Sequence, residues 1–363
     1  MATPDADLED IAGRVAAGER LTGEDGVRLL KTKDLFTLGR LARLACRRRH
    51  GDRVYFVVNR HINHTNVCVN GCRFCAFGKK PGDPQAFTLS LDEIEARAGA
   101  CREMRLTELH IVGGLNPALG LDFYVDMLRR LRRALPEVHI KALTAVEIDY
   151  LARREGLTVT EVLRILKEAG LASLPGGGAE VFAPRVRRLV CPRKISGERW
   201  LEIHEEAHRL GLPTNATILY GHVETPEERV DHLLRLRDLQ DRTGGFLAFI
   251  PLAFQPWRTP LKALPGPTGL DDLRMIAVAR LLLDNFAHIK AYWIGIGPGM
   301  AQLALHFGAD DVDGTVVEEK ISHAAGAATP ERATRAELER LIAGAGLVPV
   351  ERDTFYNPVE RGH

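Results

Sequence analysis

The chain lacks the features that most often place a protein at a nucleic acid, in a membrane or outside the cell. Its 49 Lys and Arg residues nearly balance its 48 Asp and Glu residues, and the net charge of +1 creates no field that would attract nucleic acid or an anionic membrane. The longest apolar stretch, near residues 245–254, is too short to cross a bilayer, and residues 1–20 contain no secretion signal. These absences predict a soluble, cytoplasmic protein.

Cysteine is scarce, and no pattern in the sequence suggests disulfide pairs. Three of the six cysteines, Cys46, Cys101 and Cys191, stand alone in the sequence. A chain of 363 residues with 45% apolar content can bury a large core without disulfides, which are typical of small secreted domains. We therefore expect free thiols and a reducing compartment.

The dinucleotide-binding pattern G-x-G-x-x-G is absent from the first strand-to-helix turn, which disfavours a doubly wound open sheet. Between residues 54 and 314 the chain instead repeats a β-rich run, a turn with glycine or polar residues, and an amphipathic helix. The predicted strands are residues 54–65, 108–112, 139–144, 171–174, 214–220, 246–252, 289–294 and 310–314. The predicted helices are residues 91–104, 121–135, 146–170, 197–210, 226–243, 270–286 and 298–307. This alternation predicts an α/β fold, a closed (β/α)8 TIM-type barrel.

Both ends of the chain extend beyond the repeat. Residues 1–50 contain three short helical patterns, and a capping box is predicted at Thr22 and Asp25. The last part of the chain contains a helical pattern near residues 334–343 and an apolar run at residues 347–350. Since no flexible linker separates these parts, we predict an N-terminal helical extension (1–50), a barrel (51–316) and a C-terminal extension (317–363) packed on the barrel.

The most informative segment is Cys68-Val-Asn-Gly-Cys72-Arg-Phe-Cys75, which gathers three thiols on one loop. Polar residues and glycine between the cysteines argue against a packed core element. Three thiolates are one ligand short of a four-cysteine cage, so a [4Fe–4S] cluster bound here would keep one open iron. A zinc site completed by His61 or His64 is the alternative at this stage.

The cysteine spacing, with an aromatic residue before the third cysteine, resembles the radical S-adenosylmethionine (SAM) superfamily. The resemblance implies a TIM-type radical SAM barrel in which Cys68, Cys72 and Cys75 bind a [4Fe–4S] cluster and the open iron chelates SAM. It also places Phe77 near the adenine and Gly113-Gly114 near the ammonium group of SAM. Leu115 stands where many members of the superfamily have Glu.

The chemical groups of SAM suggest binding roles for two further residues, which follow the fourth predicted strand. Glu180 follows three glycines and has the two oxygens needed to accept hydrogen bonds from the ribose hydroxyls. Three arginines shortly after it, Arg185, Arg187 and Arg188, are candidates for the methionine carboxylate, and we favour Arg187.

Longer motifs narrow the resemblance to the aminodeoxyfutalosine synthases of menaquinone biosynthesis. They are His110-Ile-Val-Gly-Gly-Leu-Asn-Pro117, Lys141-Ala-Leu-Thr-Ala-Val-Glu-Ile148, Ser173-Leu-Pro-Gly-Gly-Gly-Ala-Glu180, Leu219-Tyr-Gly-His-Val-Glu-Thr225 and Ala309-Asp-Asp-Val-Asp-Gly-Thr315. Several are shared with the dehypoxanthine futalosine cyclase of the same pathway. The segments that favour the synthase are Thr144-Ala-Val-Glu-Ile-Asp-Tyr150, Cys191-Pro-Arg-Lys-Ile-Ser196 and Ile289-Lys-Ala-Tyr-Trp293. A hydrogen-abstracting cyclase and a non-catalytic metal-binding module remain the alternatives.

The resemblance implies a transferase that adds the 5′-deoxyadenosyl radical to 3-[(1-carboxyvinyl)oxy]benzoate and forms 6-amino-6-deoxyfutalosine after rearrangement and decarboxylation. It also implies an electron donor such as flavodoxin or ferredoxin. The substrate carries two carboxylates, which require cations or hydrogen-bond donors at the carboxyl end of the barrel. The candidates are His61, Thr144, Tyr220 and His222, each at the end of a predicted strand.

Overall fold

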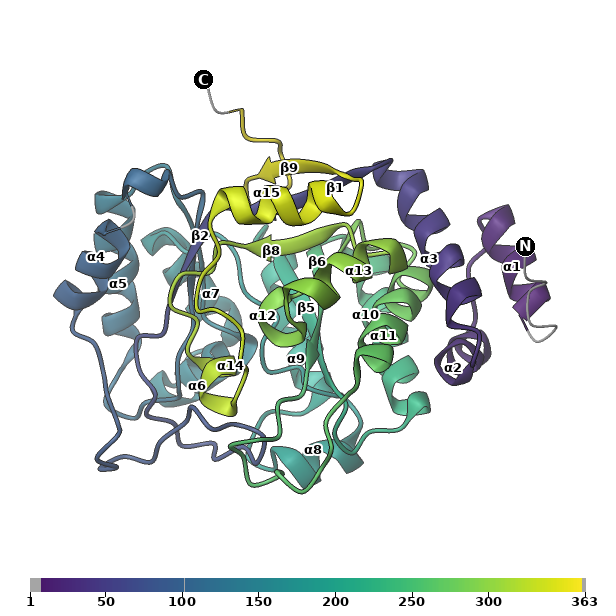
Figure 1. Cartoon of the computed structure of the whole chain (residues 1–363). Coiled ribbons are helices and arrows are strands. Elements are labelled where there is room, and N and C mark those ends of the chain that lie inside the picture. Colours follow the sequence, from purple (N-terminus) through teal and green to yellow (C-terminus); the bar gives the residue numbers. More distant parts are fainter. Residues whose placement is uncertain (1–7, 101, 361–363) are drawn as a thin grey trace.

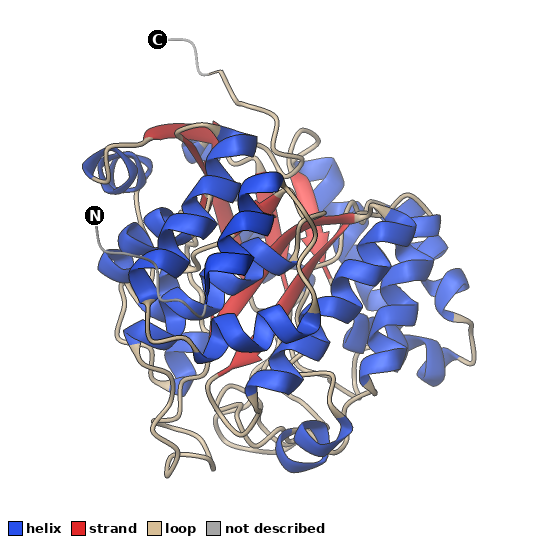
Figure 2. Cartoon of the chain, turned by 90° about the vertical axis from the view of Figure 1, so that its right-hand side faces the viewer, coloured by secondary structure: helices blue, strands red, loops and turns tan. Residues whose placement is uncertain are grey.

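The strands form a closed parallel barrel surrounded by helices, in a computed structural model that describes residues 8–100 and 102–360 (Figures 1 and 2). The strands are β1 (Arg53–Val57), β2 (Asn59–Ile62), β3 (Glu108–Ile111), β4 (His139–Ala142), β5 (Thr214–Tyr220), β6 (Phe246–Ala253), β7 (His288–Ile289), β8 (Asp311–Gly314) and β9 (Val348–Arg352). Parallel pairing joins β2 to β3 and β4, β5 to β6 and β7, and β8 to β1. Single bridges at Ser173, Leu174 and Lys290 close the ring between these sheets. The predicted barrel is confirmed.

Helices follow most of the strands and cover the outside of the barrel. They are α4 (Leu91–Gly99), α5 (Leu121–Ala134), α6 (Ala145–Glu155), α7 (Val159–Ala169), α8 (Pro184–Val190), α9 (Gly197–Arg209), α10 (Pro226–Thr243), α11 (Gly269–Leu282), α12 (Trp293–Ile296) and α13 (Pro298–Ala304). Two 3₁₀ turns, η2 (Arg102–Met104) and η3 (Leu305–Phe307), extend α4 and α13. The hydrophobic core fills the space between the strands and these helices.

Strand alternation decides which side chains reach the barrel interior. In β5 the side chains of Asn215, Thr217 and Leu219 line an internal cavity, whereas Ile218 and Tyr220 are fully buried among the core residues. The same alternation sends Glu108 and His110 of β3 inward. Polar residues are therefore spaced two apart in these strands because every second position faces the cavity.

Several predicted boundaries were wrong. The first strand breaks at Val58 into β1 and β2, residues 171–174 contribute only bridges, and residues 293–296 form α12 instead of continuing β7. The helix predicted at residues 146–170 is two helices, because Gly156 ends α6 in the left-handed conformation (φ 68°). A new capping box formed by Thr158 and Glu161 then starts α7.

The N-terminal extension forms three helices, α1 (Glu9–Ala17), α2 (Gly23–Lys31) and α3 (Leu35–His50). The capping box predicted at Thr22 and Asp25 is confirmed. Helices α2 and α3 pack against α10 and α11 on the outside of the barrel (Figure 1). None of the described helices combines the length and the apolar character needed to span a membrane.

The C-terminal part contributes to the sheet and to the interior. It forms α14 (Ile321–Ala325), α15 (Arg335–Gly344) and β9, and β9 pairs in parallel with β1. Before α14 the chain crosses the carboxyl end of the barrel, where the Lys320 amide donates to Asn63 Oδ1 at 3.2 Å. The division of the chain at residues 50 and 316 stays a prediction, although Glu319, Ile321, Ser322 and Ala325 line the cavity.

Candidate active site

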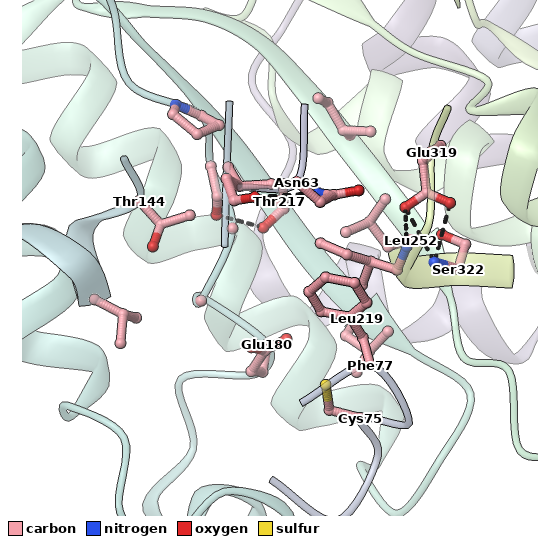
Figure 3. Close-up of a pocket in the computed structure, with 18 of the residues that line it drawn as sticks. Asn63, Cys75, Phe77, Thr144, Glu180, Thr217, Leu219, Leu252, Glu319 and Ser322 are labelled. Atoms are coloured by element: carbon pink, nitrogen blue, oxygen red, sulfur yellow. Dashed lines mark hydrogen bonds between the residues drawn. The ribbon is translucent and has the colours of Figure 1, made fainter. Parts of the chain in front are cut away.

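The carboxyl ends of the strands surround a cavity of about 330 Å³. Its wall combines the cysteine loop, the strand ends and the segment around α14 (Figure 3). Nine of the predicted site residues line it: His61, Cys68, Cys72, Cys75, Phe77, Gly113, Gly114, Thr144 and Glu180. The structure thus brings together residues from four separate parts of the sequence.

Backbone hydrogen bonds and one glycine hold the cysteine loop against the end of β3. The Val69 amide donates to the Leu115 carbonyl at 3.2 Å, and the Gly114 amide donates to the Thr65 carbonyl at 2.9 Å. A Cβ atom on Gly114 would lie 2.2 Å from the Val67 carbonyl oxygen, so only glycine allows this approach. Gly114 therefore has a steric role in seating the loop.

The arrangement of donors fits an iron–sulfur cluster better than zinc. A tetrahedral zinc ion brings its sulfur ligands to about 3.8 Å from one another. Among the described residues, the three cysteines do not form a group whose ligand atoms all lie within 4.8 Å. His61 stacks on His110 with ring centroids 4.4 Å apart, and His64 contacts the Tyr124 hydroxyl at 3.2 Å. Neither histidine is placed as a fourth zinc ligand.

Burial disfavours the thiolate form of two of the three cysteines. Burial raises the pKa of Cys72 to about 12 and also raises the pKa of Cys75. A bound metal ion reverses this preference, because a coordinating thiol loses its proton. The remaining cysteines Cys46 and Cys191 are buried away from the cavity, and Cys101 lies outside the described residues.

Glu180 lies beside a lysine that the sequence analysis had not singled out. Its carboxylate forms an ion pair with the Lys194 ammonium, and both side chains line the cavity next to the cysteine loop. Burial lowers the pKa of Lys194, but the charge and hydrogen bond of Glu180, together with the nearby Cys72 and Cys191, raise that pKa overall. Lys194 also lies 5.2 Å from the Phe74 ring centroid. Lys194 lies in the motif Cys191-Pro-Arg-Lys-Ile-Ser196, whose resemblance to the synthases was the available signal.

Gly113 and Thr144 meet at a buried carboxylate. A Cβ atom on Gly113 would lie 2.5 Å from the His64 ring, so this position also requires glycine. The Glu147 carboxylate accepts hydrogen bonds from the Gly113 amide at 3.2 Å and from the Thr144 hydroxyl at 2.8 Å. Burial raises the pKa of Glu147 to about 7. Thr144 reaches the cavity, but its hydroxyl caps α6.

Phe77 forms part of the apolar wall near the cysteines. Its side chain is buried and packs edge-on against Phe87, with ring centroids 6.1 Å apart. Figure 3 places Phe77 beside Cys75. The adenine contact predicted for Phe77 stays a prediction.

Three residues predicted at the site lie outside the cavity wall, each for a local reason. The Arg187 guanidinium donates to backbone carbonyls, including Ile195 O at 2.9 Å, and ties α8 to the chain on both sides. Tyr220 points outward from β5 and donates to Asp272 at 2.6 Å. His222 is held by Glu224, 2.9 Å from its Nδ1 atom.

Six polar side chains form what we call the polar floor of the cavity: His61, Glu108, His110, Lys141, Lys290 and Asp313. Two buried ion pairs lie within it. The Lys141 ammonium donates to Glu108 at 2.6 Å, and the Lys290 ammonium donates to Asp313 at 2.6 Å. Burial lowers the pKa of Lys141, an effect that the Glu108 charge opposes. Neither lysine was among the predicted site residues, although Lys141 and Lys290 both lie in motifs that resemble the family.

A second buried cluster, formed by His50, His288, Asp310 and Arg280, lies at the opposite, amino end of the strands. The imidazole and carboxylate atoms of its first three members lie within 4.8 Å of one another. The Asp310 carboxylate is already occupied by the Arg280 guanidinium and by His288 Nδ1 at 2.5 Å. His50 Nε2 contacts the Ala287 carbonyl at 2.8 Å. We interpret this group as a structural network.

Comparisons with known proteins agree with this site. Residues 62–236 match the radical SAM superfamily, and residues 243–362 match the CofH/MqnC C-terminal region. The aminodeoxyfutalosine synthase of Thermus thermophilus is 51% identical over 98% of this chain and 96% of its own length. The chain belongs to the radical SAM family of the aminodeoxyfutalosine synthases. It is therefore an enzyme, and the alternative of a non-catalytic metal-binding module falls away.

Other relatives show how the family extends. The aminodeoxyfutalosine synthase of Streptomyces coelicolor is 47% identical and covers 97% of this chain and 94% of the relative. The cyclic dehypoxanthine futalosine synthase of the same organism is 41% identical and covers 98% of this chain and 89% of the relative. Among solved structures, methylornithine synthase shares the fold with a TM-score of 0.76 at 19% identity, over 93% of this chain and 97% of that chain.

Proposed function

We propose that the enzyme is an aminodeoxyfutalosine synthase. In this reaction the 5′-deoxyadenosyl group of SAM joins 3-[(1-carboxyvinyl)oxy]benzoate, and the product is 6-amino-6-deoxyfutalosine. Methionine and carbon dioxide leave, so that atoms and charge balance between the SAM cation, the benzoate dianion and the product monoanion. The observation that carries this proposal is the identity of 51% and 47% to two synthases over nearly the full chain, compared with 41% to the cyclic dehypoxanthine futalosine synthase.

The donor set of the cysteine loop fits a [4Fe–4S] cluster, which Cys68, Cys72 and Cys75 would hold. When bound, the cluster and SAM supply a 5′-deoxyadenosyl radical. Around SAM, Glu180 is the acceptor for the ribose hydroxyls and Gly113 offers close backbone approach. Lys194 replaces Arg187 as the candidate cation for the methionine carboxylate, because it is the cation beside Glu180 on the cavity wall.

The protein contributes enclosure and orientation. Leu219, Leu252 and Phe254 present apolar surface to the cavity, and Ile321, Ser322 and Ala325 of α14 form another part of its wall. Such a wall keeps water away from reactive carbon centres and holds the substrate in one orientation. An electron donor such as flavodoxin or ferredoxin completes the proposed system.

Isotope labelling separates this function from that of the cyclase. The anaerobically reconstituted enzyme is incubated with reductant, 3-[(1-carboxyvinyl)oxy]benzoate and SAM that carries carbon-13 in its adenosine. A synthase places the label in a product heavier than the benzoate by an adenosyl group less carbon dioxide. One SAM is consumed for each product formed.

A hydrogen-abstracting cyclase gives a different balance. With dehypoxanthine futalosine as substrate, it would release labelled 5′-deoxyadenosine in step with an unlabelled product. That result, together with no labelled product from the enolpyruvyl benzoate, would overturn the synthase proposal.

A further inference from the structure

The polar floor lies deeper in the barrel than the residues proposed for the cofactor. His61, His110 and Lys141 occupy paired positions on the adjacent strands β2, β3 and β4. Lys290 immediately follows β7, and Asp313 is in β8. The cysteines, Gly113 and Glu180 instead lie on segments that follow strand ends. The cavity therefore has a cofactor end and a floor end.

The polar floor contains more hydrogen-bond donors than its described protein acceptors use. An ammonium group carries three hydrogens, and within the described residues Lys141 and Lys290 donate one hydrogen bond each, to Glu108 and to Asp313. His61 is 6% exposed, and its Nε2 atom has no partner within the described part of the chain. Buried polar groups normally have partners, so unused donors on a cavity wall indicate a ligand with acceptor atoms.

The wall between the two ends changes character along one strand. In β5 the inward residues pass from Asn215 through Thr217 to Leu219, that is, from an amide through a hydroxyl to an aliphatic side chain. Ile250 and Leu252 of β6 add further apolar surface. A ligand that fits this gradient has an anionic group at one end and an apolar or aromatic body.

We propose that Lys141, Lys290 and His61 bind the benzoate carboxylate of the aromatic substrate and direct its vinyl group toward the cysteine loop. This inference rests on the proposed function. The carboxylate would accept hydrogen bonds from the two ammonium groups while each keeps its own acidic partner.

The geometry of the substrate selects the benzoate carboxylate for this place. The enolpyruvyl carboxylate is attached to the vinyl group that receives the adenosyl group, so it must stay close to the cofactor end. The benzoate carboxylate lies across the ring from that group and can reach the floor. The two carboxylates therefore have different binding sites.

Binding without reductant tests the proposal, since no turnover occurs. The dissociation constant of 3-[(1-carboxyvinyl)oxy]benzoate is measured by calorimetry on the cluster-loaded enzyme with SAM, and the same is done for its two monomethyl esters. We expect Lys290→Met and Lys141→Met each to weaken binding of the diacid by roughly 10- to 100-fold, as for a lost charge-assisted hydrogen bond. The ester at the enolpyruvyl carboxyl should lose affinity in the variants to the same extent. For the ester at the benzoate carboxyl, the dissociation constants of wild type and variants should differ by less than about threefold, because this ester has no benzoate charge for the lysines to bind.

Removing one lysine leaves a buried carboxylate without its partner, which can prevent folding. The paired variants Glu108→Gln with Lys141→Met and Asp313→Asn with Lys290→Met remove both charges and should show the same selective loss. Arg352→Met is the matched control, because Arg352 is a buried cation that pairs with Asp311 at 2.7 Å and does not line the cavity. It should lower the melting temperature without changing the affinity for the diacid.

The outcomes separate this inference from the proposed function. Normal diacid affinity in the folded paired variants, or an equal loss for both monoesters, overturns the role of the floor even if the wild type forms labelled product. Wild-type enzyme that neither binds the diacid nor forms the adenosylated product would overturn the proposed function and this inference with it.

Discussion

The two ends of the barrel both bury a cluster of charged groups, but the two clusters differ in how many hydrogen bonds their charged groups form within the described protein. At the amino end, Asp310 accepts from Arg280, from His288 and from the Ile289 amide at 2.8 Å. Arg280 also donates to the Gly308 and Ala287 carbonyls at 2.8 Å and 3.0 Å. Although burial raises the pKa of Asp310, the Arg280 charge together with the two histidines holds that pKa well below its usual range. The protein itself satisfies this cluster.

At the carboxyl end, Lys141 and Lys290 face a cavity and each donates a single hydrogen bond in the described structure. Both clusters contain ionic pairs and histidines, and composition alone does not separate them. The difference lies in whether the polar atoms are satisfied within the protein. A closed network stabilises the fold, whereas an open one on a cavity wall is suited to a ligand.

The largest expected effect is loss of the [4Fe–4S] cluster proposed for the cysteine loop, at the carboxyl end of the barrel. Replacing any one of Cys68, Cys72 and Cys75 by Ala should abolish the broad visible absorbance of the reconstituted protein and reduce turnover to background. The melting temperature of the metal-free protein should change little, because these side chains lie on a loop at the cavity wall. Absorbance spectra and thermal melts measure both.

Cys46→Ala and Cys191→Ala are the matched controls, since both thiols are buried outside the cavity. They should keep the cluster spectrum. A requirement for Cys191 in cluster assembly would contradict the assignment of an open iron, because a fourth thiolate would then be available.

The next largest effect is expected for the charged cluster at the amino end of the barrel, where a substitution should change only the stability of the fold. Arg280→Met leaves Asp310 as a buried charge without its main partner, so the free energy of unfolding should fall by about 3–5 kcal/mol. Denaturant unfolding of the metal-free protein measures this change. The cluster spectrum and the affinity for SAM of the folded variant should equal those of the wild type. A selective loss of SAM affinity would break the distinction between the two ends.

Sequence analysis predicted best the features that depend on local pattern. The observed bounds of α10 and β5 equal the predicted ones, because Thr225 caps α10 and apolar residues run through β5. The three cysteines could be found from their spacing within one loop. The short strands were placed within a few residues, and the weak strand at residues 171–174 contributes only bridges.

Features that depend on pairing between distant segments could not be predicted. Lys141 and Lys290 lie 149 positions apart, and only closure of the barrel brings them to one cavity. Arg187 was a reasonable candidate from its distance to Glu180, but α8 turns its guanidinium toward backbone carbonyls. Tyr220 was predicted at the cavity, but alternate residues of β5 face opposite sides, and Asn215, Thr217 and Leu219 take the side that faces the cavity.

A pH-dependent effect of intermediate size is expected at Glu147, a cavity-wall carboxylate without a cationic partner in the described structure. Burial raises its pKa from 4.5 to about 7, so the folded protein binds this proton more tightly than the unfolded chain. The resulting stability is present below pH 4.5 and is lost as the pH rises to 7, by about 3 kcal/mol. Unfolding of wild type and Glu147→Gln at pH 4.5 and 7.5 measures the difference.

The wild type should lose stability over this range relative to Glu147→Gln. Glu161 occupies the same position in the capping box of α7, but it is exposed and hydrogen bonds from Thr158 lower its pKa. Its contribution is present above the unfolded pKa and is lost as the pH falls, so Glu161→Gln should show a small change of opposite sign. Equal pH profiles for wild type and Glu147→Gln would contradict the raised pKa.

The smallest expected effect concerns SAM affinity at the cavity end. Glu180→Gln keeps the shape of the side chain but removes the charge that pairs with Lys194 and that we propose accepts hydrogen bonds from the ribose. The affinity for SAM, measured by calorimetry without reductant, should fall by about 1–3 kcal/mol while the cluster spectrum stays unchanged. Glu224→Gln is the matched control, because Glu224 is a buried carboxylate paired with Arg229 at 2.7 Å and lies outside the cavity wall. The control should lose stability and keep its SAM affinity. If Glu180→Gln also keeps its SAM affinity, Glu180 serves only to hold Lys194, and the cofactor end of the cavity would resemble the closed network at the amino end.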